Sequence, residues 1–272
     1  MIWSTNILDD ARARNCYFGL AASPLIADDL VIVSPGGKGA SLVAYDALTG
    51  GMRWKAGDAR ASYSSPHRVE LAGTEQILIF NAEGLYAHEL KSGRVLWNVP
   101  WISNPSERNN VCQPVPVALP TGDGVFISSS YGKGCALLEV RREKKRFAVR
   151  QVWSNLNLKS KFASVVEKDG FVYGLDERIL TCIDLTTGGR CWKAGRYGFG
   201  QLLLVDDLLL VLSENGEVAL VDASPAGYRE VAKFRALDGR TWGHPVLAGR
   251  YLIVRSEAEA ACYELALVGG FE

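Results

Sequence analysis

Short apolar runs separated by polar turns recur along the whole chain. The runs are rich in Val, Ile, Leu, Phe and Tyr, as in LVIV, ILIF, VFIS, FVYG, LLLVL and YLIV. Turn sequences such as ADD, GDG, KDG and ENG bound them. Runs of this length and composition predict β-strands, and the sequence has no convincing helical periodicity. The pattern therefore predicts an all-β protein.

An acidic residue stands before a turn once in each unit of the sequence. The steps between successive acids range from 38 to 50 residues. A period near forty is typical of propeller blades or of paired-helix arrays. Because the runs are strand-like, the propeller is favoured. The acids are Asp46, Glu89, Glu139, Asp184, Asp222 and Glu264.

The order within each unit predicts a four-stranded antiparallel blade. An inner strand is followed by an apolar strand, a strand ending at the acid, and an edge strand after a Thr-Gly or Ser-Gly turn. The six predicted blades cover residues 20–58, 62–103, 110–157, 160–196, 198–237 and 241–267. The last blade lacks an edge strand, whereas the chain begins with one, IWSTNIL. We therefore expect a strand at residues 1–8 to close the sixth blade, so that residues 1–272 form a single β-propeller domain.

The recurring turn has two expected structural roles. Its acid is expected to hydrogen-bond turn amides, and its glycine to take the positive φ of a tight hairpin. An aromatic residue on the edge strand then covers the seam with a neighbouring blade. This residue is a tryptophan in most units and Phe234 in the fifth. The tryptophans are Trp3, Trp54, Trp97, Trp153 and Trp192.

Composition and charge exclude several classes of protein. Thirty basic and thirty acidic residues cancel, which argues against a nucleic-acid partner. The basic run RREKKR at 141–146 is expected to be a solvated hairpin tip. No stretch approaches the roughly 18 apolar residues that span a bilayer. The start of the chain lacks the basic and apolar regions of a signal peptide.

Six cysteines show no C-x-x-C spacing, so no zinc site is predicted. Cys182 and Cys191 flank a turn, and an antiparallel hairpin could bring them close enough for a disulfide. Two reduced thiols packed as small hydrophobic groups are the favoured alternative.

The repeats AYDALTGGMRW, AHELKSGRVLW and CIDLTTGGRCW resemble the tryptophan-docking motif of pyrroloquinoline-quinone (PQQ)-type propellers. That superfamily includes quinoprotein alcohol dehydrogenases, PQQ-binding-like repeat proteins and the periplasmic outer-membrane-assembly lipoprotein. The resemblance runs from Trp3 to Glu264. It implies the propeller fold, an exported or periplasmic setting, and PQQ as a cofactor by family resemblance only. Because one propeller scaffold hosts many activities, the resemblance does not determine the function.

Two departures from the family pattern bear on function. Such propellers commonly have eight blades, and we count six, which fits either a six-bladed relative or part of a larger propeller. The quinoprotein dehydrogenases stack PQQ against two adjacent, disulfide-linked cysteines and hold calcium with Glu, Asn and Asp. No two cysteines are adjacent here, and no calcium ligands can be carried over. The resemblance thus argues for the fold and against quinone-dependent oxidation.

No catalytic or metal site is predicted. His67, His88 and His244 show neither metalloprotease nor nucleophile-elbow spacing. The glycine-rich segments PGGKGAS and YGKGCA lack the P-loop pattern and are expected to be hairpin turns.

The segments that lead into the inner strands are expected to meet at the mouth of a central channel. Aromatic walls with a few convergent polar groups form the default binding-site hypothesis. The alternative is that these side chains only hydrate the mouth and close the ring. No pair among them makes an acid–base or nucleophile–base set. The candidate ligand-binding residues are Tyr63, Asn110, Gln113, Lys161, Trp242 and His244.

The leading hypothesis is a non-catalytic scaffold that binds a protein, a peptide or a small ligand at the channel mouth or a blade edge. The alternative is a cofactor-dependent oxidoreductase in which Lys161 and Arg108 bind quinone carboxylates and Trp242 stacks on the ring. A third hypothesis, a lyase or hydrolase, has no catalytic constellation to support it. The sequence predicts no oligomeric state.

Overall fold

The structure is a computed structural model, and it describes residues 1–102 and 114–265. Within these ranges, strands β1–β23 form six antiparallel sheets, five with four strands and one with three. In every sheet, strands that follow one another in sequence are hydrogen-bonded neighbours. The predicted all-β class with blade-like sheets is therefore confirmed. The chain separates into two compact units, Met1–Leu156 and Asn157–Glu272.

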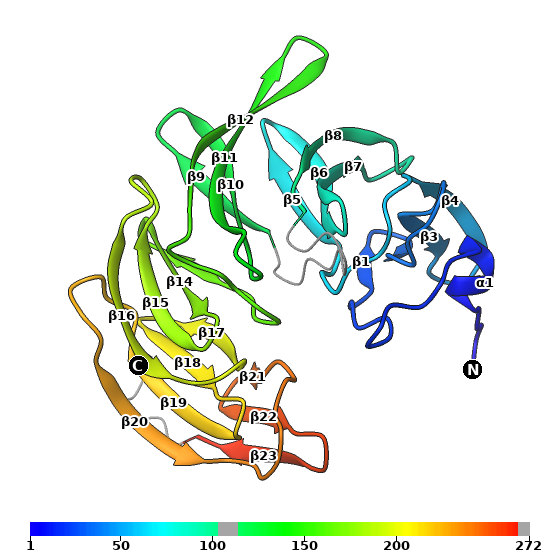
Figure 1. The fold of residues 1–272 in the computed structure, drawn as a ribbon. Helices are drawn as coiled ribbons and strands as arrows, with labels where there is room; N and C mark the ends of the chain where they lie inside the picture. Colours follow the sequence, from blue (N-terminus) through cyan, green and yellow to red (C-terminus); the bar gives the residue numbers. More distant parts are fainter. Residues whose placement is uncertain (103–113, 266–272) are drawn as a thin grey trace, which may run out of the picture. The chain divides into compact units, whose positions relative to one another are not determined.

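The first unit contains the short helix α1 (Ile7–Ala11) and three sheets (Figure 1). The first sheet contains β1 (Leu25–Ala27), β2 (Leu30–Val33), β3 (Leu42–Asp46) and β4 (Met52–Ala56). The second contains β5 (His67–Leu71), β6 (Thr74–Asn81), β7 (Gly84–Glu89) and β8 (Val95–Pro100). The third contains β9 (Val115–Leu119), β10 (Gly122–Ser129), β11 (Gly134–Glu143) and β12 (Arg146–Asn155).

The second unit also contains three sheets. The fourth sheet of the chain contains β13 (Val166–Lys168), β14 (Phe171–Asp176), β15 (Ile179–Asp184) and β16 (Arg190–Arg196). The fifth contains β17 (Gln201–Val205), β18 (Leu208–Leu212), β19 (Glu217–Asp222) and β20 (Glu230–Arg235). The sixth contains β21 (Val246–Ala248), β22 (Tyr251–Arg255) and β23 (Ala260–Glu264).

Burial along the strands explains their sequences. In most sheets the second strand is buried over most of its length, as in β6 and β10. In the sixth sheet, β22 instead alternates between buried and exposed residues. The fourth strand either mixes partly buried and exposed residues, as in β4, or is exposed throughout, as in β20. In the first unit, one apolar cluster joins the first and second sheets and another joins the second and third. In the second unit, two clusters join the fourth sheet to the fifth and the fifth to the sixth.

The acid of the recurring turn holds the turn closed. Asp46 accepts hydrogen bonds from the backbone N–H of Leu48 at 3.0 Å and of Thr49 at 2.8 Å. Asp184 accepts one from the backbone N–H of Thr187 at 2.8 Å. Glu89 differs, because its carboxylate accepts from the Ser92 hydroxyl. These side chains therefore stabilise the turn.

The tryptophan of one sheet packs on the next sheet. The Trp54 ring lies against Gly93 in the turn of the second sheet, where a β-carbon would stand 2.3 Å from Cε3. The Trp192 indole N–H donates to the Ser224 carbonyl of the fifth sheet at 2.8 Å. Trp97 is only 6% exposed and lies in the core between the second and third sheets. These rings join successive sheets within each unit.

The aromatic residue of the fifth sheet occupies a shifted position. Trp192 pairs with the residue at the register shift of its sheet, whereas the corresponding place in the fifth sheet belongs to Ala232. Phe234 lies two residues further along the same strand face. Its ring contacts Tyr263 of the sixth sheet, with centroids 5.2 Å apart. In the third sheet, the Trp153 ring lies 6.0 Å from that of Phe126.

The expected N-terminal strand at residues 1–8 is wrong. Residues 1–6 form no strand, and helix α1 follows, capped by the Asn6 side chain, which accepts a hydrogen bond from the Leu8 N–H. The Trp3 indole N–H donates to the Ala47 carbonyl at 3.0 Å, and its ring lies against Gly50. Trp3 thus makes the expected contact with a turn without belonging to a strand.

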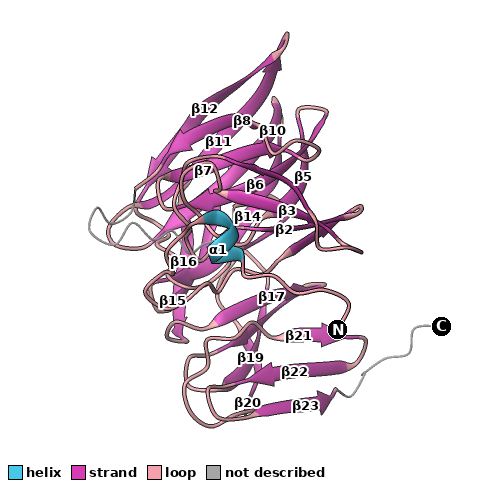
Figure 2. Ribbon diagram, turned by 90° about the vertical axis from the view of Figure 1, so that its right-hand side faces the viewer, coloured by secondary structure: helices cyan, strands magenta, loops and turns pink. Residues whose placement is uncertain are grey.

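The basic run 141–146 forms the tip of a long hairpin, as predicted. Strands β11 and β12 continue past their sheet, and Figure 2 shows the tip extending away from it. Cys182 and Cys191 are free thiols, the first buried and the second exposed. In the described parts of the chain, no helix has the length and apolarity to cross a membrane.

Candidate binding surface

Three aromatic rings meet in the second unit, each from a loop that leads into an inner strand. We call residues 157–165, 197–200 and 236–245 the inner loops and the rings of Phe162, Phe199 and Trp242 the aromatic cluster. The Phe162 centroid lies 5.6 Å from that of Trp242 and 6.1 Å from that of Phe199. Trp242 is 38% exposed. Three successive sheets therefore contribute to one apolar surface that solvent reaches.

Cationic side chains surround these rings. The Lys161 ammonium lies 4.9 Å from the Phe199 centroid, and the Arg178 guanidinium lies 4.8 Å from it. The Arg240 guanidinium lies 5.0 Å from the Trp242 centroid. A cation at this distance over a ring face is attracted by roughly 0.5–1 kcal/mol when exposed. The surface combines flat apolar rings with surplus positive charge.

Two polar side chains fix the positions of the rings. Gln201 is 2% exposed, and its amide N–H groups donate to the backbone carbonyls of Phe162 and, at 3.3 Å, of Trp242. Glu214 accepts from the Trp242 indole N–H at 3.0 Å and from the Phe199 backbone N–H at 3.2 Å. In the described residues, the buried Oε1 of Gln201 has no hydrogen-bond partner. Hydrogen bonds from Gln201 and Glu214 therefore fix the loops that carry the aromatic cluster before a ligand binds.

Phe162 is held in an unusual backbone conformation. Its φ is 61°, in the left-handed region that bulky side chains rarely adopt. Such a residue stores roughly 1–3 kcal/mol of strain and persists only where its surroundings impose it. The hydrogen bond from Gln201 to the Phe162 carbonyl is one such constraint.

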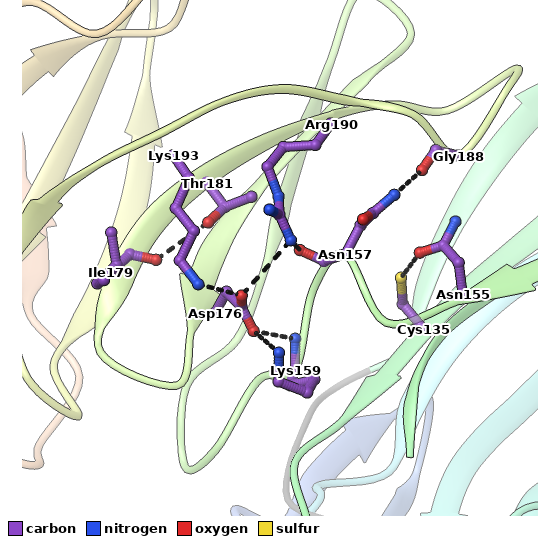
Figure 3. Close-up of polar contacts among 10 residues, drawn as sticks. All are labelled: Cys135, Asn155, Asn157, Lys159, Asp176, Ile179, Thr181, Gly188, Arg190 and Lys193. Carbon is purple, nitrogen blue, oxygen red and sulfur yellow. Dashed lines mark hydrogen bonds and ion pairs between the residues drawn. The ribbon is translucent and has the colours of Figure 1, made fainter. Parts of the chain in front are cut away.

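A buried carboxylate on the fourth sheet is paired with several cationic side chains. Asp176, at the end of β14, is 1% exposed and lies between Lys159, Lys193 and Arg190 (Figure 3). The Lys159 ammonium is 2.8 Å from Oδ1, the Lys193 ammonium contacts Oδ2, and Arg190 is 3.9 Å from Oδ2. Burial raises the pKa of Asp176, but its hydrogen bonds with the two lysines outweigh this effect and lower it overall. One buried carboxylate thus faces three cationic side chains.

The structure brings together only some of the predicted binding residues. Lys161 and Trp242 belong to the surface just described. His244 lies on the same inner loop as Trp242, and desolvation lowers the pKa of its imidazole. Asn110 and Gln113 lie outside the described residues, as does Arg108. That all six candidates form one mouth stays a prediction.

Tyr63 belongs to the first unit and to a different aromatic group. Its hydroxyl oxygen accepts a hydrogen bond from the Phe18 backbone N–H at 3.0 Å, and the two rings lie 6.1 Å apart. Phe18 also stacks edge-to-face on Tyr17, which is 88% exposed.

The sequence did not single out several residues that build the surface. Phe199, Arg178 and Arg240 are separated along the chain, so no local motif links them. Gln201 and Glu214 act through hydrogen bonds with residues 15–41 positions away. Of the residues predicted to bind a ligand, Lys161 and Trp242 belong to this surface.

The comparisons with known proteins agree with this architecture. The sequence pattern of the family described as outer membrane protein assembly factor BamB matches residues 2–194, well over half of the chain. The chain belongs to this BamB-like family of PQQ-type propellers. No curated protein matches the sequence.

Solved structures place the BamB-like chain among propellers. BamB from Moraxella catarrhalis matches with a TM-score of 0.60 and 18% identity, over 87% of this chain and 68% of that one. The computationally designed Ika8 protein matches with a TM-score of 0.60 and 8% identity, over 90% and 70%. Quinohemoprotein alcohol dehydrogenase from Comamonas testosteroni matches with a TM-score of 0.53 and 12% identity, over 80% and 43%. Identities this low show the fold alone.

The residues of this BamB-like chain do not fit the quinone site of the dehydrogenase branch. The sequence has no two adjacent cysteines, and every described cysteine is a free thiol. Among the described residues, no group of three or more His, Cys, Asp or Glu side chains is arranged to hold a metal ion.

Proposed function

We propose that this BamB-like chain is a non-catalytic binding module and that the aromatic cluster with its cations is its contact surface. The observation that carries the proposal is the meeting of Phe162, Phe199 and Trp242 under Lys161, Arg178 and Arg240. Aromatic and arginine side chains dominate the binding energy of protein interfaces. The family description concerns outer membrane protein assembly, which supports a protein partner and an exported location.

The chemistry of the surface indicates the partner's chemistry. The rings favour aromatic or aliphatic side chains, and the cations favour carboxylates. Glu214 is the acid bonded to these rings, and its carboxylate is already engaged with Trp242 and Phe199. The partner segment is therefore acidic and carries at least one aromatic residue.

A sheet edge is the second candidate surface. In the described residues, the sixth sheet ends at β23, whereas each other sheet has a fourth strand. An unpaired edge can accept an extended segment from another protein. If variants of the aromatic cluster kept their affinity for the partner, the contact would instead be assigned to this edge.

Site-specific crosslinking tests the proposal. A photoreactive phenylalanine analogue at Trp242 should capture a specific protein in cells of the source organism. The same analogue at Leu48, which is 80% exposed in the first unit, is the matched control. The captured protein is then purified, and its affinity is measured against wild-type and variant chains.

The affinity measurements decide the outcome. Trp242→Ala and the pair Arg178→Gln with Arg240→Gln should each weaken binding at least roughly tenfold, as expected for interface hot spots. Lys144→Gln on the hairpin tip should have no effect. Equal affinities for all of these chains would reject the surface.

A titration with PQQ, with and without calcium, tests the oxidoreductase alternative. Fluorescence of the seven tryptophans reports binding, and no saturable quenching is expected. Saturable quenching that Trp242→Ala or Lys161→Ala abolishes would replace the protein-binding proposal with a cofactor site.

A further inference from the structure

A small pocket lies in the first unit, between the end of β8 and strand β12. Its volume is about 270 Å³, just below the roughly 300–1,000 Å³ of sites that hold drug-sized ligands. It suits a ligand of amino-acid size. The side chains that matter for its chemistry are Val99, Trp101, Lys133, Gln151, Ser154 and Leu156.

The walls of the pocket are fixed by close backbone approaches. A β-carbon on Gly84 would lie 2.2 Å from the Val99 carbonyl oxygen, and one on Gly134 would lie 2.0 Å from that of Asn155. Each approach is possible because the residue is glycine, and it draws the next strand inward. The Trp101 indole N–H donates to the Ser129 hydroxyl at 3.0 Å, which fixes the ring. The pocket is therefore formed before a ligand arrives.

The polar groups of the pocket are suited to an anion. Lys133 is the one formally charged side chain among the described residues that line it. Its ammonium lies 4.5 Å from the Trp101 centroid, so the ring holds it at the pocket without neutralising it. Gln151 donates to the Ser154 hydroxyl oxygen at 3.1 Å, which leaves the hydroxyl proton of Ser154 free to point at a ligand.

The apolar groups define the rest of the ligand. Val99, Trp101 and Leu156 provide a branched and aromatic surface beside the ammonium and hydroxyl groups. A ligand that satisfies both parts has one carboxylate and a compact apolar body. A phosphate lacks the apolar body.

We propose that this pocket binds a small organic monocarboxylate. Its carboxylate lies between the Lys133 ammonium and the Ser154 hydroxyl, and its apolar body lies against Trp101 and Leu156. The proposal is independent of the protein-binding surface in the second unit, because the two share no residue.

Binding of 3-phenylpropionate to the full chain, followed by NMR, tests the proposal. The Trp101 indole N–H signal, assigned with Trp101→Phe, should shift on titration with a dissociation constant of roughly 1 mM, as expected for about ten heavy atoms. The amide 3-phenylpropionamide, which has the same shape without the charge, should bind at least roughly tenfold more weakly.

Variants locate the carboxylate. Lys133→Gln should weaken 3-phenylpropionate binding at least roughly tenfold, Ser154→Ala severalfold, and Lys133→Arg much less than Lys133→Gln. Lys144→Gln, a change of the same kind on the exposed hairpin turn, should leave binding unchanged. Lys133 is exposed, so these chains should keep their melting temperatures. Equal affinity for acid and amide, unchanged affinity in Lys133→Gln, or no saturable shift would each overturn the proposal.

Discussion

At Gly93 the indole of Trp54 lies where a β-carbon would otherwise stand. The backbone there has φ of 71°, and the nearest ring atom would be 2.3 Å from the added carbon. Gly93→Ala should lower the free energy of unfolding by roughly 2–4 kcal/mol, because backbone strain and overpacking add. Gly73 has a similar φ of 65° but open space around it, so Gly73→Ala should cost only about 1 kcal/mol. Urea unfolding of both variants measures the difference, and equal losses would contradict the ring contact.

His88 is fully buried on β7, with Nδ1 2.7 Å from the Gly93 carbonyl oxygen. In the described part of the chain, its Nε2 has no hydrogen-bond partner. Desolvation lowers the pKa of His88, although the hydrogen bond to Gly93 opposes this effect. The imidazole is therefore neutral at pH 7, with Nδ1–H donating.

The lowered pKa of His88 makes stability depend on pH. The folded protein binds fewer protons than the unfolded chain, so the free energy of unfolding should fall as pH drops below about 6.5, by at most about 1.4 kcal/mol per pH unit. His88→Leu should remove this part of the dependence between pH 7.5 and 5.5, as measured by urea unfolding. His67→Gln on the exposed start of β5 serves as the control. A variant with the wild-type slope would show that the pKa of His88 is the same in the folded and unfolded chain.

At the scale of the strand, Glu139 joins β11 to β12 and to the turn between β9 and β10. It is 2% exposed and accepts hydrogen bonds from Thr121, from Arg141 at 2.7 Å and from Arg150 at 3.1 Å. The bond from Thr121 and those from the two arginines lower the pKa of Glu139 to about 2. The acid that precedes a turn in the other repeats is here buried inside a longer strand.

Glu139 should therefore contribute to stability only where it is ionised. Its contribution is complete above the unfolded pKa of about 4.5 and is lost as pH falls toward the folded value of about 2. Glu139→Gln should be less stable than wild type at pH 6 and closer to it at pH 3. Glu143→Gln, on the exposed end of the same strand, should match wild type at both. Chemical denaturation at the two pH values provides the test, and a constant difference would rule out the ionised network.

The positions of the strands could be predicted from the sequence, but a short helix and the register of the strand pairs could not. Apolar runs bounded by turn residues identified the central strands, because burial on both faces demands such sequences. Helix α1 was missed because five residues give too little periodicity, and its Asn6 cap resembles any polar position. Phe234 was expected at the tryptophan position, yet strand pairing places Ala232 there. The sequence shows no signal for the register shift in this sheet.

The candidate surface depends on contacts between loops of the second unit that no single segment encodes. Trp242 and Lys161 were expected from the segments that lead into the inner strands. Their supports, Gln201 and Glu214, were not, because a hydrogen bond between loops requires the packing of the sheets that carry them.

At the scale of the whole chain, Trp97 and Trp242 represent two kinds of tryptophan, one buried in a core and one exposed at the candidate surface. Trp97 is 6% exposed in the core between two sheets, whereas Trp242 is 38% exposed and hydrogen-bonded to Glu214. Trp97→Ala should lower the free energy of unfolding by roughly 3–5 kcal/mol. Trp242→Ala should lower it by less than about 1 kcal/mol. Thermal or urea unfolding compares them, and comparable losses would assign Trp242 to the core instead of the binding surface.

The joint between sheets has a consequence for how such a chain evolves. Trp54 on Gly93 and Trp3 on Gly50 are the same contact made twice, although Trp3 belongs to no strand. An interface built from one ring and one glycine turn is interchangeable between positions. Recombination between similar repeats can therefore add or delete a whole sheet without inventing a new contact, and the number of sheets is free to vary among relatives that share the same parts.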